Sequence, residues 1–287
     1  MEKRIGIVGC GFVGNAIRQG FSKYMPVQVY DKYDKKRTTT DSFEELVNCC
    51  DILFICLPTP MKRTGECDSS LVNTTIKTLD FLANKQDKKK IAVIKSTVPP
   101  GTTLSLQNST SNLVDIIFNP EFLTEANSVE DFINQKRVIL GGDECIKSLQ
   151  TLKKIYMKVL PESPCILSDS IEAELVKYYC NCFLAIKVSF SNEMKQLCDR
   201  LGANYDKVIK AVSYDTRIGS SHMEVPGPDG KYGFGGSCFP KDISALIRIM
   251  QDNDVSSTIT TAAWQKNLEV RPERDWEQLI GRAVVKD

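Results

Sequence analysis

Residues 4–14 read Arg-Ile-Gly-Ile-Val-Gly-Cys-Gly-Phe-Val-Gly, and this stretch decides the fold. Its first part predicts a β-strand over residues 4–8, and a helical pattern follows the glycines and ends before Pro26. In such a unit the first glycine allows the tight turn, the second lets a pyrophosphate approach the backbone, and the third lets helix pack on strand. The helix N-terminus offers N–H groups to phosphate. We therefore expect a bound dinucleotide, contacted by Gly9, Gly11, Phe12, Val13 and Gly14.

A second strand, predicted over residues 27–30, ends at Asp31. An acidic residue about twenty positions after the glycines can bind both ribose hydroxyls, and it would repel a 2′-phosphate. NAD is therefore favoured over NADP. Four basic residues nearby weaken this preference, and Lys36 is itself a candidate cofactor contact; they are Lys32, Lys35, Lys36 and Arg37.

Strand and helix patterns alternate through the first half of the chain. Strands are predicted over residues 52–57, 91–94, 114–118 and 137–142, the last of these as the final strand, and helices over 43–47, 71–83 and 144–158. Such alternation predicts an α/β fold with a parallel, doubly wound sheet of the Rossmann type, whose ligands bind beyond the carboxyl ends of the strands. We expect this domain to occupy residues 1–168.

Loops after three of these strands carry polar residues. Pro58 and Thr59 follow one strand and Thr97 follows another, where they could form a rigid wall beside the nicotinamide and Thr97 could position a water. Glu121 and Glu125 follow the third, would share one helix face, and could supply a base. The alternatives are ordinary turn residues and charge decoration at a helix start.

Residues 169–201 have helical periodicity without glycine or proline. The helix would be roughly 50 Å long, more than one small domain needs, so we expect it to join the domains and to form a homodimer interface. Lys177 and Asn181 project together, one turn apart, among apolar neighbours. Buried polar groups need partners, so a substrate contact or a structural hydrogen bond would explain them. Residues 169–287 are predicted to form a small all-α domain.

Residues 231–242 read Lys-Tyr-Gly-Phe-Gly-Gly-Ser-Cys-Phe-Pro-Lys-Asp. The glycines allow positive φ or close approach to a ligand, and Pro240 suits the first turn of a helix. Cys238 would then precede a helix start, where the helix dipole and Lys241 favour the thiolate and lower the pKa of the thiol from about 8.5. A catalytic nucleophile is the favoured interpretation, and a buried structural thiol is the alternative.

Composition excludes several classes of function. The formal net charge of +1 argues against nucleic acid as a partner, and the cluster at residues 88–90 is interpreted as a solvated turn. No apolar stretch reaches the length of a membrane span, and no signal peptide precedes the first strand. Eleven cysteines then indicate reduced thiols and a cytoplasmic protein. With a single histidine, we expect no metal site and acid–base chemistry from Lys, Asp, Glu, Cys or Tyr.

Taken together, these motifs resemble the UDP-glucose 6-dehydrogenase and GDP-mannose 6-dehydrogenase family. The resemblance runs from Lys3 to about Asp242 and rests on Gly9-x-Gly11-x-x-Gly14, Pro58-Thr59-Pro60, residues 96–102 (Ser-Thr-Val-Pro-Pro-Gly-Thr), Asn119-Pro120-Glu121-Phe122-Leu123-x-Glu125, Lys177-x-x-x-Asn181 and Gly235-Gly236-x-Cys238-x-Pro240-Lys241-Asp242. Members usually continue into a C-terminal nucleotide-binding domain, whereas 45 residues follow Asp242 here. The sequence therefore resembles a truncated or naturally short form of UDP-glucose 6-dehydrogenase.

The resemblance implies roles for individual residues. Those implied in catalysis are Cys238 as nucleophile, Lys177 and Asn181 at the oxyanion, and Asp242, Thr97, Glu125 and Glu121 in handling water and protons. Those implied at the substrate are Glu121, Phe122, Leu123, Lys177, Asn181, Tyr232, Gly233, Gly235 and, from a dimer partner, Arg217. Cofactor contacts are extended to Pro58, Thr59, Thr97, Glu125 and Lys241.

The implied reaction is a four-electron oxidation of UDP-glucose to UDP-glucuronate by NAD, through a thiohemiacetal and a thioester on Cys238. Three alternatives stay open. GDP-mannose or another nucleotide sugar could be the substrate, a β-hydroxyacid-type enzyme would perform a two-electron oxidation without Cys238, and a non-catalytic module would only bind NAD.

Overall fold

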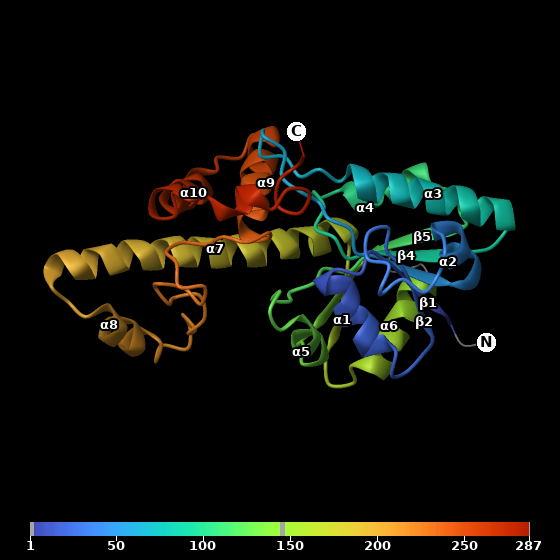
Figure 1. The fold of residues 1–287 in the computed structure, drawn as a ribbon, viewed down its shortest axis with the longest axis horizontal. Coiled ribbons are helices and arrows are strands. Elements are labelled where there is room, and N and C mark those ends of the chain that lie inside the picture. The colour runs from blue at the N-terminus through green and yellow to red at the C-terminus, as the bar shows by residue number, and fades with distance from the viewer. Residues whose placement is uncertain (1–2, 144–146, 287) are drawn as a thin grey trace. The chain divides into compact units, whose positions relative to one another are not determined.

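A computed structural model describes residues 3–143 and 147–286, drawn in Figure 1. Contacts divide the chain into two compact units, with Met1–Thr59 and Ser69–Lys177 in unit 1 and Pro60–Asp68 and Tyr178–Asp287 in unit 2. The predicted division into domains at residues 168 and 169 stays a prediction. Among the described residues, no helix is both long and apolar enough to span a membrane.

Unit 1 contains a seven-stranded sheet in the order β2-β1-β3-β4-β5-β6-β7. The strands are β1 Ile5–Val8, β2 Val27–Tyr30, β3 Ile52–Ile55, β4 Lys90–Ile94, β5 Val114–Phe118, β6 Val138–Gly141 and β7 Cys165–Ser168. All pairings are parallel except β5 with β6. The reversal of order at β1 confirms the predicted doubly wound α/β fold.

The prediction that residues 137–142 form the last strand is wrong, because β7 follows β6 and lies at the sheet edge. β7 is only partly buried, and Ile166 is 46% exposed. An edge strand of four residues without a continuous apolar run leaves little periodic signal in the sequence.

Helices cover both faces of this sheet, and Figure 1 shows α3 and α4 on one side with α1, α5 and α6 on the other. Their bounds are α1 Phe12–Phe21, α2 Phe43–Cys49, α3 Ser70–Gln86, α4 Thr102–Ser109, α5 Ser128–Ile133 and α6 Lys147–Val159. Strand residues alternate between the two cores, as Ile7 packs with α1 and α6 while Val8 packs with α2 and α3. Residues 144–146, where a helix was predicted to begin, lie outside the described residues.

The prediction of a solvated turn at residues 88–90 is wrong for Lys90, which begins β4 and is buried. Its Nζ donates to the Cys50 carbonyl at 2.7 Å and to the Val47 carbonyl, so it closes the C-terminal end of α2. Helix α4 was not predicted, because its sequence, Thr-Thr-Leu-Ser-Leu-Gln-Asn-Ser, is short and weakly amphipathic.

Unit 2 is built on most of the long helix α7 (Ser170–Leu201), with α8 Tyr205–Val212, α9 Phe239–Asp252, α10 Thr258–Val270 and a short 3-10 turn at Asp275–Gln278. Its core includes Tyr178, Cys182, Phe234 and Ile243. The segment 60–68 also belongs here, because Met61 pairs with Val284 near the end of the chain. The predicted long helix is confirmed to within one residue.

Candidate functional site

The glycine turn between β1 and α1 has the predicted form. Gly9 has φ +85°, and a Cβ there would lie 2.5 Å from the Cys56 carbonyl oxygen, while a Cβ on Gly14 would overlap the Gly9 carbonyl. No atom lies within 4 Å of a Cβ position on Gly11. Gly9 and Gly14 are therefore required by the fold, whereas the open side of Gly11 lies where a pyrophosphate would approach the start of α1.

Asp31 follows β2 and faces this turn. Its carboxylate accepts hydrogen bonds from the backbone N–H groups of Cys10 (2.6 Å), Tyr33 (2.8 Å) and Asp34 (2.9 Å). Burial alone would raise the pKa of Asp31, but these donors outweigh burial and lower it. A carboxylate has about four acceptor positions, so about one is left for a ribose hydroxyl. Lys36 is exposed, and its backbone N–H donates to Asp34 Oδ1 at 3.1 Å.

The loops after β3 and β4 are joined by Ser96. Its hydroxyl accepts from the Leu57 N–H at 2.9 Å and donates to the Leu57 carbonyl at 2.6 Å. This pairing fixes Pro58 and Thr59 beside Thr97, and both threonines are buried. The three predicted cofactor contacts therefore lie at the carboxyl edge of the sheet, with the glycine turn.

Lys177 and Glu121 form a buried ion pair in unit 1. The Lys177 Nζ lies 2.9 Å from Glu121 Oε1 and 2.6 Å from the Glu121 carbonyl oxygen. The other carboxylate oxygen accepts from the Leu123 N–H at 2.7 Å, and the Phe122 ring lies beneath the ammonium. Burial by itself would raise the pKa of Glu121, but Lys177 outweighs it and the pKa is lowered.

The expectation that Glu121 and Glu125 share a helix face is wrong. Residues 119–127 are not helical, Glu121 is buried and Glu125 is exposed. In a helix the Glu121 carbonyl would accept from residue 125, but here Lys177 takes that carbonyl. The roles predicted for Glu121 and Glu125 in handling water and protons stay predictions.

A second buried lysine supports the same loop and was missed as a site residue. Lys95, at the end of β4, donates to Asn119 Oδ1 at 3.0 Å and to the Pro120 carbonyl at 3.3 Å. Burial lowers the pKa of Lys95 to about 8. The residues before Glu121 are thus held by Lys95 and Glu121 itself by Lys177. A lysine at the end of an apolar strand was the only signal in the sequence.

Glu174 was also missed, although it lies one turn before Lys177 on α7. Its carboxylate accepts from the Gly101 N–H at 2.6 Å and from the N–H and hydroxyl of Thr103 at 2.9 and 2.6 Å. These N–H groups belong to the first turn of α4, which has no intrahelical partners for them. Glu174 thereby ties the loop that contains Thr97 to α7.

In unit 2, Cys238 occupies the N-cap position of α9, as predicted, with Pro240 in the first turn. Asp242 is buried, and it accepts from Asn181 Nδ2 at 2.6 Å and from Lys241 Nζ at 2.5 Å. Burial would lower the pKa of Lys241, but Asp242 outweighs it and the pKa is raised. The structure therefore brings Asn181 of α7 to the Lys241–Asp242 pair in the first turn of α9, the helix that Cys238 begins.

The glycine loop before Cys238 is held by side chains from two helices. Gly233 and Gly236 have positive φ, as predicted for glycine. Asn267 of α10 accepts from the Phe234 N–H and donates to its carbonyl, at 2.7 and 2.9 Å, and Asn192 of α7 accepts from the Gly233 N–H. Tyr232, in the same loop, is exposed.

Arg217 lies elsewhere in unit 2, on the loop after α8. Its side chain is 88% exposed and pairs with Asp215 at 2.6 Å. Lys187 of α7 donates to the carbonyls of Ile218 and Gly219, at 3.0 and 2.9 Å, and so anchors this loop. An exposed arginine on an anchored loop is available to a neighbouring molecule.

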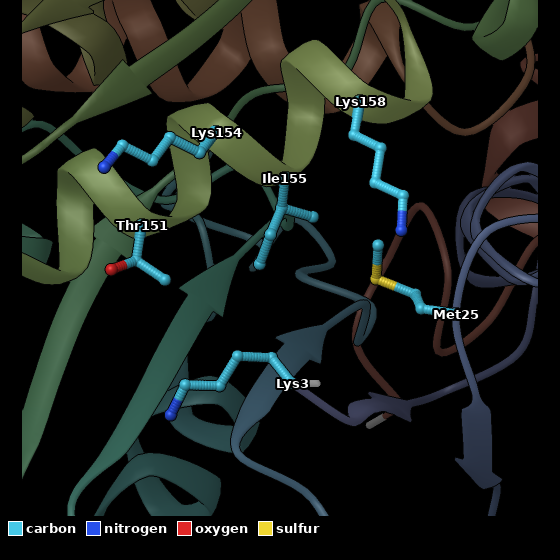
Figure 2. Close-up of a pocket in the computed structure, with 6 residues that line it drawn as sticks. All are labelled: Lys3, Met25, Thr151, Lys154, Ile155 and Lys158. Atoms are coloured by element: carbon cyan, nitrogen blue, oxygen red, sulfur yellow. The ribbon is translucent and has the colours of Figure 1, made fainter. Parts of the chain in front are cut away.

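A surface pocket of about 230 Å³ lies in unit 1, as Figure 2 shows. Its lining residues are Lys3, Met25, Thr151, Lys154, Ile155 and Lys158. Lys3 precedes β1, whereas the glycine turn follows it, so this pocket is at the amino edge of the strands. None of the predicted site residues lines it.

Two family models match the chain. Residues 27–160 match the NAD binding domain of the UDP-glucose/GDP-mannose dehydrogenase family, and residues 171–269 match its central domain. The UDP-glucose 6-dehydrogenase of Rickettsia bellii is 38% identical over 242 residues, which cover 83% of this chain and 54% of that protein. TuaD of Bacillus subtilis, also a UDP-glucose 6-dehydrogenase, is 33% identical over 83% of this chain and 50% of its own. The chain thus spans about half the length of these curated relatives.

Solved structures show the same likeness. A UDP-glucose dehydrogenase from Pyrobaculum islandicum superposes with a TM-score of 0.84 at 30% identity, covering 94% of this chain and 68% of that one. A 3-hydroxyisobutyrate dehydrogenase from Mycobacterium tuberculosis reaches a TM-score of 0.74 at 16% identity, over 96% of this chain and 95% of its own. The second likeness is one of fold alone.

Proposed function

The chain belongs to the UDP-glucose/GDP-mannose dehydrogenase family, and from that premise we propose that it oxidises UDP-glucose to UDP-glucuronate in a four-electron reaction with NAD. The observation that carries the proposal is the position of Cys238. It begins α9, after a glycine loop and one turn from the Lys241–Asp242 pair, with Asn181 bound to the same carboxylate. A two-electron alcohol dehydrogenase has no use for such a thiol.

The cofactor fits the residues of unit 1. The glycine turn, the open side of Gly11 and the N–H groups of Phe12 and Val13 suit a pyrophosphate, and Asp31 suits a ribose hydroxyl. We assign the nicotinamide side to Pro58, Thr59 and Thr97. When bound, NAD accepts one hydride in each of the two oxidation steps.

Cys238 makes the second oxidation possible. Its thiolate adds to the C6 aldehyde and forms a C–S bond, which gives a thiohemiacetal whose C–H can leave as hydride. The resulting thioester is cleaved by water, and the C–S bond breaks to release the carboxylate and the thiol. The helix start at Cys238 favours the thiolate through the dipole of α9.

Oxygen at C6 bears negative charge during these steps, and preorganised donors each supply roughly 3 to 4 kcal/mol of stabilisation. We assign this role to Lys177 and Asn181, both on α7. Water and protons are assigned to Asp242, Thr97 and Glu125, with Glu121 as the support of Lys177. These assignments follow the family resemblance.

Substrate contacts are assigned to two loops that buried side chains hold in place. Phe122 and Leu123 follow Glu121, and Tyr232, Gly233 and Gly235 lie in the loop before Cys238. UDP-glucose is favoured over GDP-mannose by the segment Gly-Gly-Ser-Cys-Phe-Pro-Lys-Asp and by the names of the relatives. We place the reaction in the cytoplasm because the eleven cysteines suit a reducing compartment. The family resemblance implies polysaccharide biosynthesis as the use of its product.

A homodimer through α7 completes the proposal. Large apolar side chains along this helix in unit 2 are exposed, and their spacing puts them near one face: Tyr179, Phe183, Phe190, Leu197 and Leu201. Burying such a face against a second copy removes it from water. Arg217 would then reach the substrate of the partner subunit.

The number of NADH molecules produced per UDP-glucose consumed tests the reaction. We expect about two, because the sugar loses four electrons. Cys238→Ala should abolish acid formation, while Cys165→Ala, a half-buried thiol on β7, should leave the yield unchanged. A yield of one, or no turnover of UDP-glucose, GDP-mannose or UDP-N-acetylmannosamine, would overturn the proposal.

A two-electron oxidation of a β-hydroxyacid is the second candidate, because such enzymes also pair a Rossmann domain with a long helix that carries Lys and Asn one turn apart, as α7 carries Lys177 and Asn181. It predicts that Cys238→Ala keeps full activity on a hydroxyacid. Binding of NAD without oxidation of either class of substrate would instead support a non-catalytic module.

A further inference from the structure

Arg271 follows α10 and carries a buried guanidinium, only 2% exposed. Its Nε lies 2.7 Å from Asp275 Oδ1, one terminal nitrogen lies 2.7 Å from Asp229 Oδ2 and 3.0 Å from Asp275 Oδ2, and the other donates to the Tyr232 carbonyl at 3.3 Å. The matched central-domain region ends at residue 269, so neither family model reaches Arg271. Sequence patterns had assigned it no role.

These contacts join segments that are far apart in the sequence. Asp275 is one turn away, but Asp229 and Tyr232 precede Arg271 by 42 and 39 residues and lie in the loop that leads to Cys238. A buried charge is costly unless it is paired and hydrogen-bonded, and Arg271 keeps its full set of partners only while residues 229–232 keep their position. The guanidinium fork also fixes direction, because it presents several donors in one plane.

Gly235 shows how closely the loop fits against Arg271. Gly235 does not have a positive φ, so its backbone conformation does not require glycine. A Cβ there would lie 2.5 to 2.7 Å from three atoms of the Arg271 guanidinium. A flexible arginine could usually move aside, but this one would have to give up its bonds to Asp229 and Asp275.

We propose that Arg271 is a positioning residue for the substrate loop: it holds residues 229–235 in the conformation that receives the sugar and phosphate of the nucleotide sugar, ahead of Cys238. The reference to a nucleotide sugar rests on the proposed function. The loop conformation itself does not, and it can be measured separately. Arg271 acts through Tyr232 and Gly235 and is not assigned a contact with the reacting atoms.

Replacing the guanidinium tests the role in substrate binding. For Arg271→Met we expect KM for UDP-glucose to rise about tenfold or more while KM for NAD changes less than about twofold, because NAD is assigned to unit 1. The KM of Arg271→Lys for UDP-glucose should lie between those of the wild type and Arg271→Met, because one ammonium cannot bind both carboxylates as the planar guanidinium does. Arg274→Lys, three residues along in an exposed pair with Glu277, is the matched control and should match the wild type. Equal changes in both KM values would overturn the proposal.

Combining substitutions at Gly235 and Arg271 tests the close fit. Gly235→Ala alone should weaken binding of UDP-glucose, measured by calorimetry, by about tenfold or more, because the added methyl displaces the guanidinium. In Gly235→Ala/Arg271→Met the methyl has room. The double variant should therefore bind UDP-glucose at least about fivefold more tightly than the product of the two single effects predicts. Strictly multiplicative effects would contradict the contact.

Hydrogen exchange separates this inference from the proposed function. The peptide spanning residues 229–236 should exchange about tenfold faster in Arg271→Met than in the wild type, and at the wild-type rate in Arg274→Lys. If the wild type neither binds nor oxidises any nucleotide sugar while this exchange result holds, the proposed substrate is wrong and the positioning role stands. Unchanged exchange in Arg271→Met would refute the positioning role, whatever the activity.

Discussion

Lys177 and Glu121 are almost completely removed from water, with 3% and 9% of their side chains exposed. A buried ion pair contributes little compared with apolar residues of the same size, but removing one partner leaves an unpaired buried charge. The pair therefore holds the Glu121–Leu123 segment in place as much as it offers an ammonium to a substrate. The charge of Glu121 depends on the presence of Lys177.

Lys177→Met should lower the free energy of unfolding by about 3 to 5 kcal/mol at neutral pH. In the wild type the pKa of Glu121 is lowered, so the stability it contributes is present above about pH 4.3 and is lost as pH falls through the folded value. In the variant, protonation relieves the unpaired carboxylate. The difference between the two proteins should therefore narrow as pH falls, measured by urea unfolding at about pH 7 and about pH 4.

Lys85→Met provides the control for this substitution, because Lys85 forms an exposed pair with Glu44. It should cost less than about 1 kcal/mol at either pH. If Lys177→Met also lost less than about 1 kcal/mol, Glu121 would not be left as an unpaired buried charge when the lysine is removed.

Helix α7 anchors loops through five polar residues spread along its length. Glu174 holds the start of α4, Lys177 holds Glu121, Asn181 holds Asp242, Lys187 holds residues 218 and 219, and Asn192 holds Gly233. Four of these five are nearly inaccessible to water, so each needs the partner it has. The helix therefore fixes loops in both units through its side chains.

Glu174→Gln tests one of these anchors and has the opposite dependence on pH from Glu121. Burial raises the pKa of Glu174, although Thr103 and Gly101 oppose it. Its contribution to stability is therefore complete below about pH 4.3 and is lost as pH rises through the folded value. The wild type should lose stability relative to Glu174→Gln between about pH 4 and about pH 7 in urea unfolding. A difference that stays constant, or that grows in favour of the wild type, would show that burial does not dominate.

The apolar face of α7 leads to a prediction for the assembled protein. If two copies pack through α7, Phe183→Glu combined with Phe190→Glu should convert a dimer of about twice 32.1 kDa into a monomer, because charges at the centre of an apolar interface are not solvated. Light scattering coupled to gel filtration measures the mass. Phe81→Glu, at an exposed position on α3 in unit 1, should leave the dimer intact. A wild-type monomer, or a dimer that survives both substitutions in α7, would contradict the assembly.

Local patterns in the sequence determined the alternation of strands and helices, the glycine turn, the length of α7 and the helix start at Cys238. Each depends on residues within a few positions of one another, through periodicity, positive φ or capping. The same patterns put Glu121 and Glu125 on one helix face and gave no signal for β7, because neither outcome was local. Lys177, 56 residues away, takes the Glu121 carbonyl, and β7 is an edge strand.

Only the tertiary structure decided which buried polar groups are paired. Lys95 with Asn119, Glu174 with Thr103 and Arg271 with Asp229 are separated by 24, 71 and 42 residues. A single sequence states which groups must find partners if buried, but not which will be buried or how the chain brings partners together. That is why the helix start at Cys238 could be predicted from its surroundings in the sequence, while the residues that hold the loop before it could not.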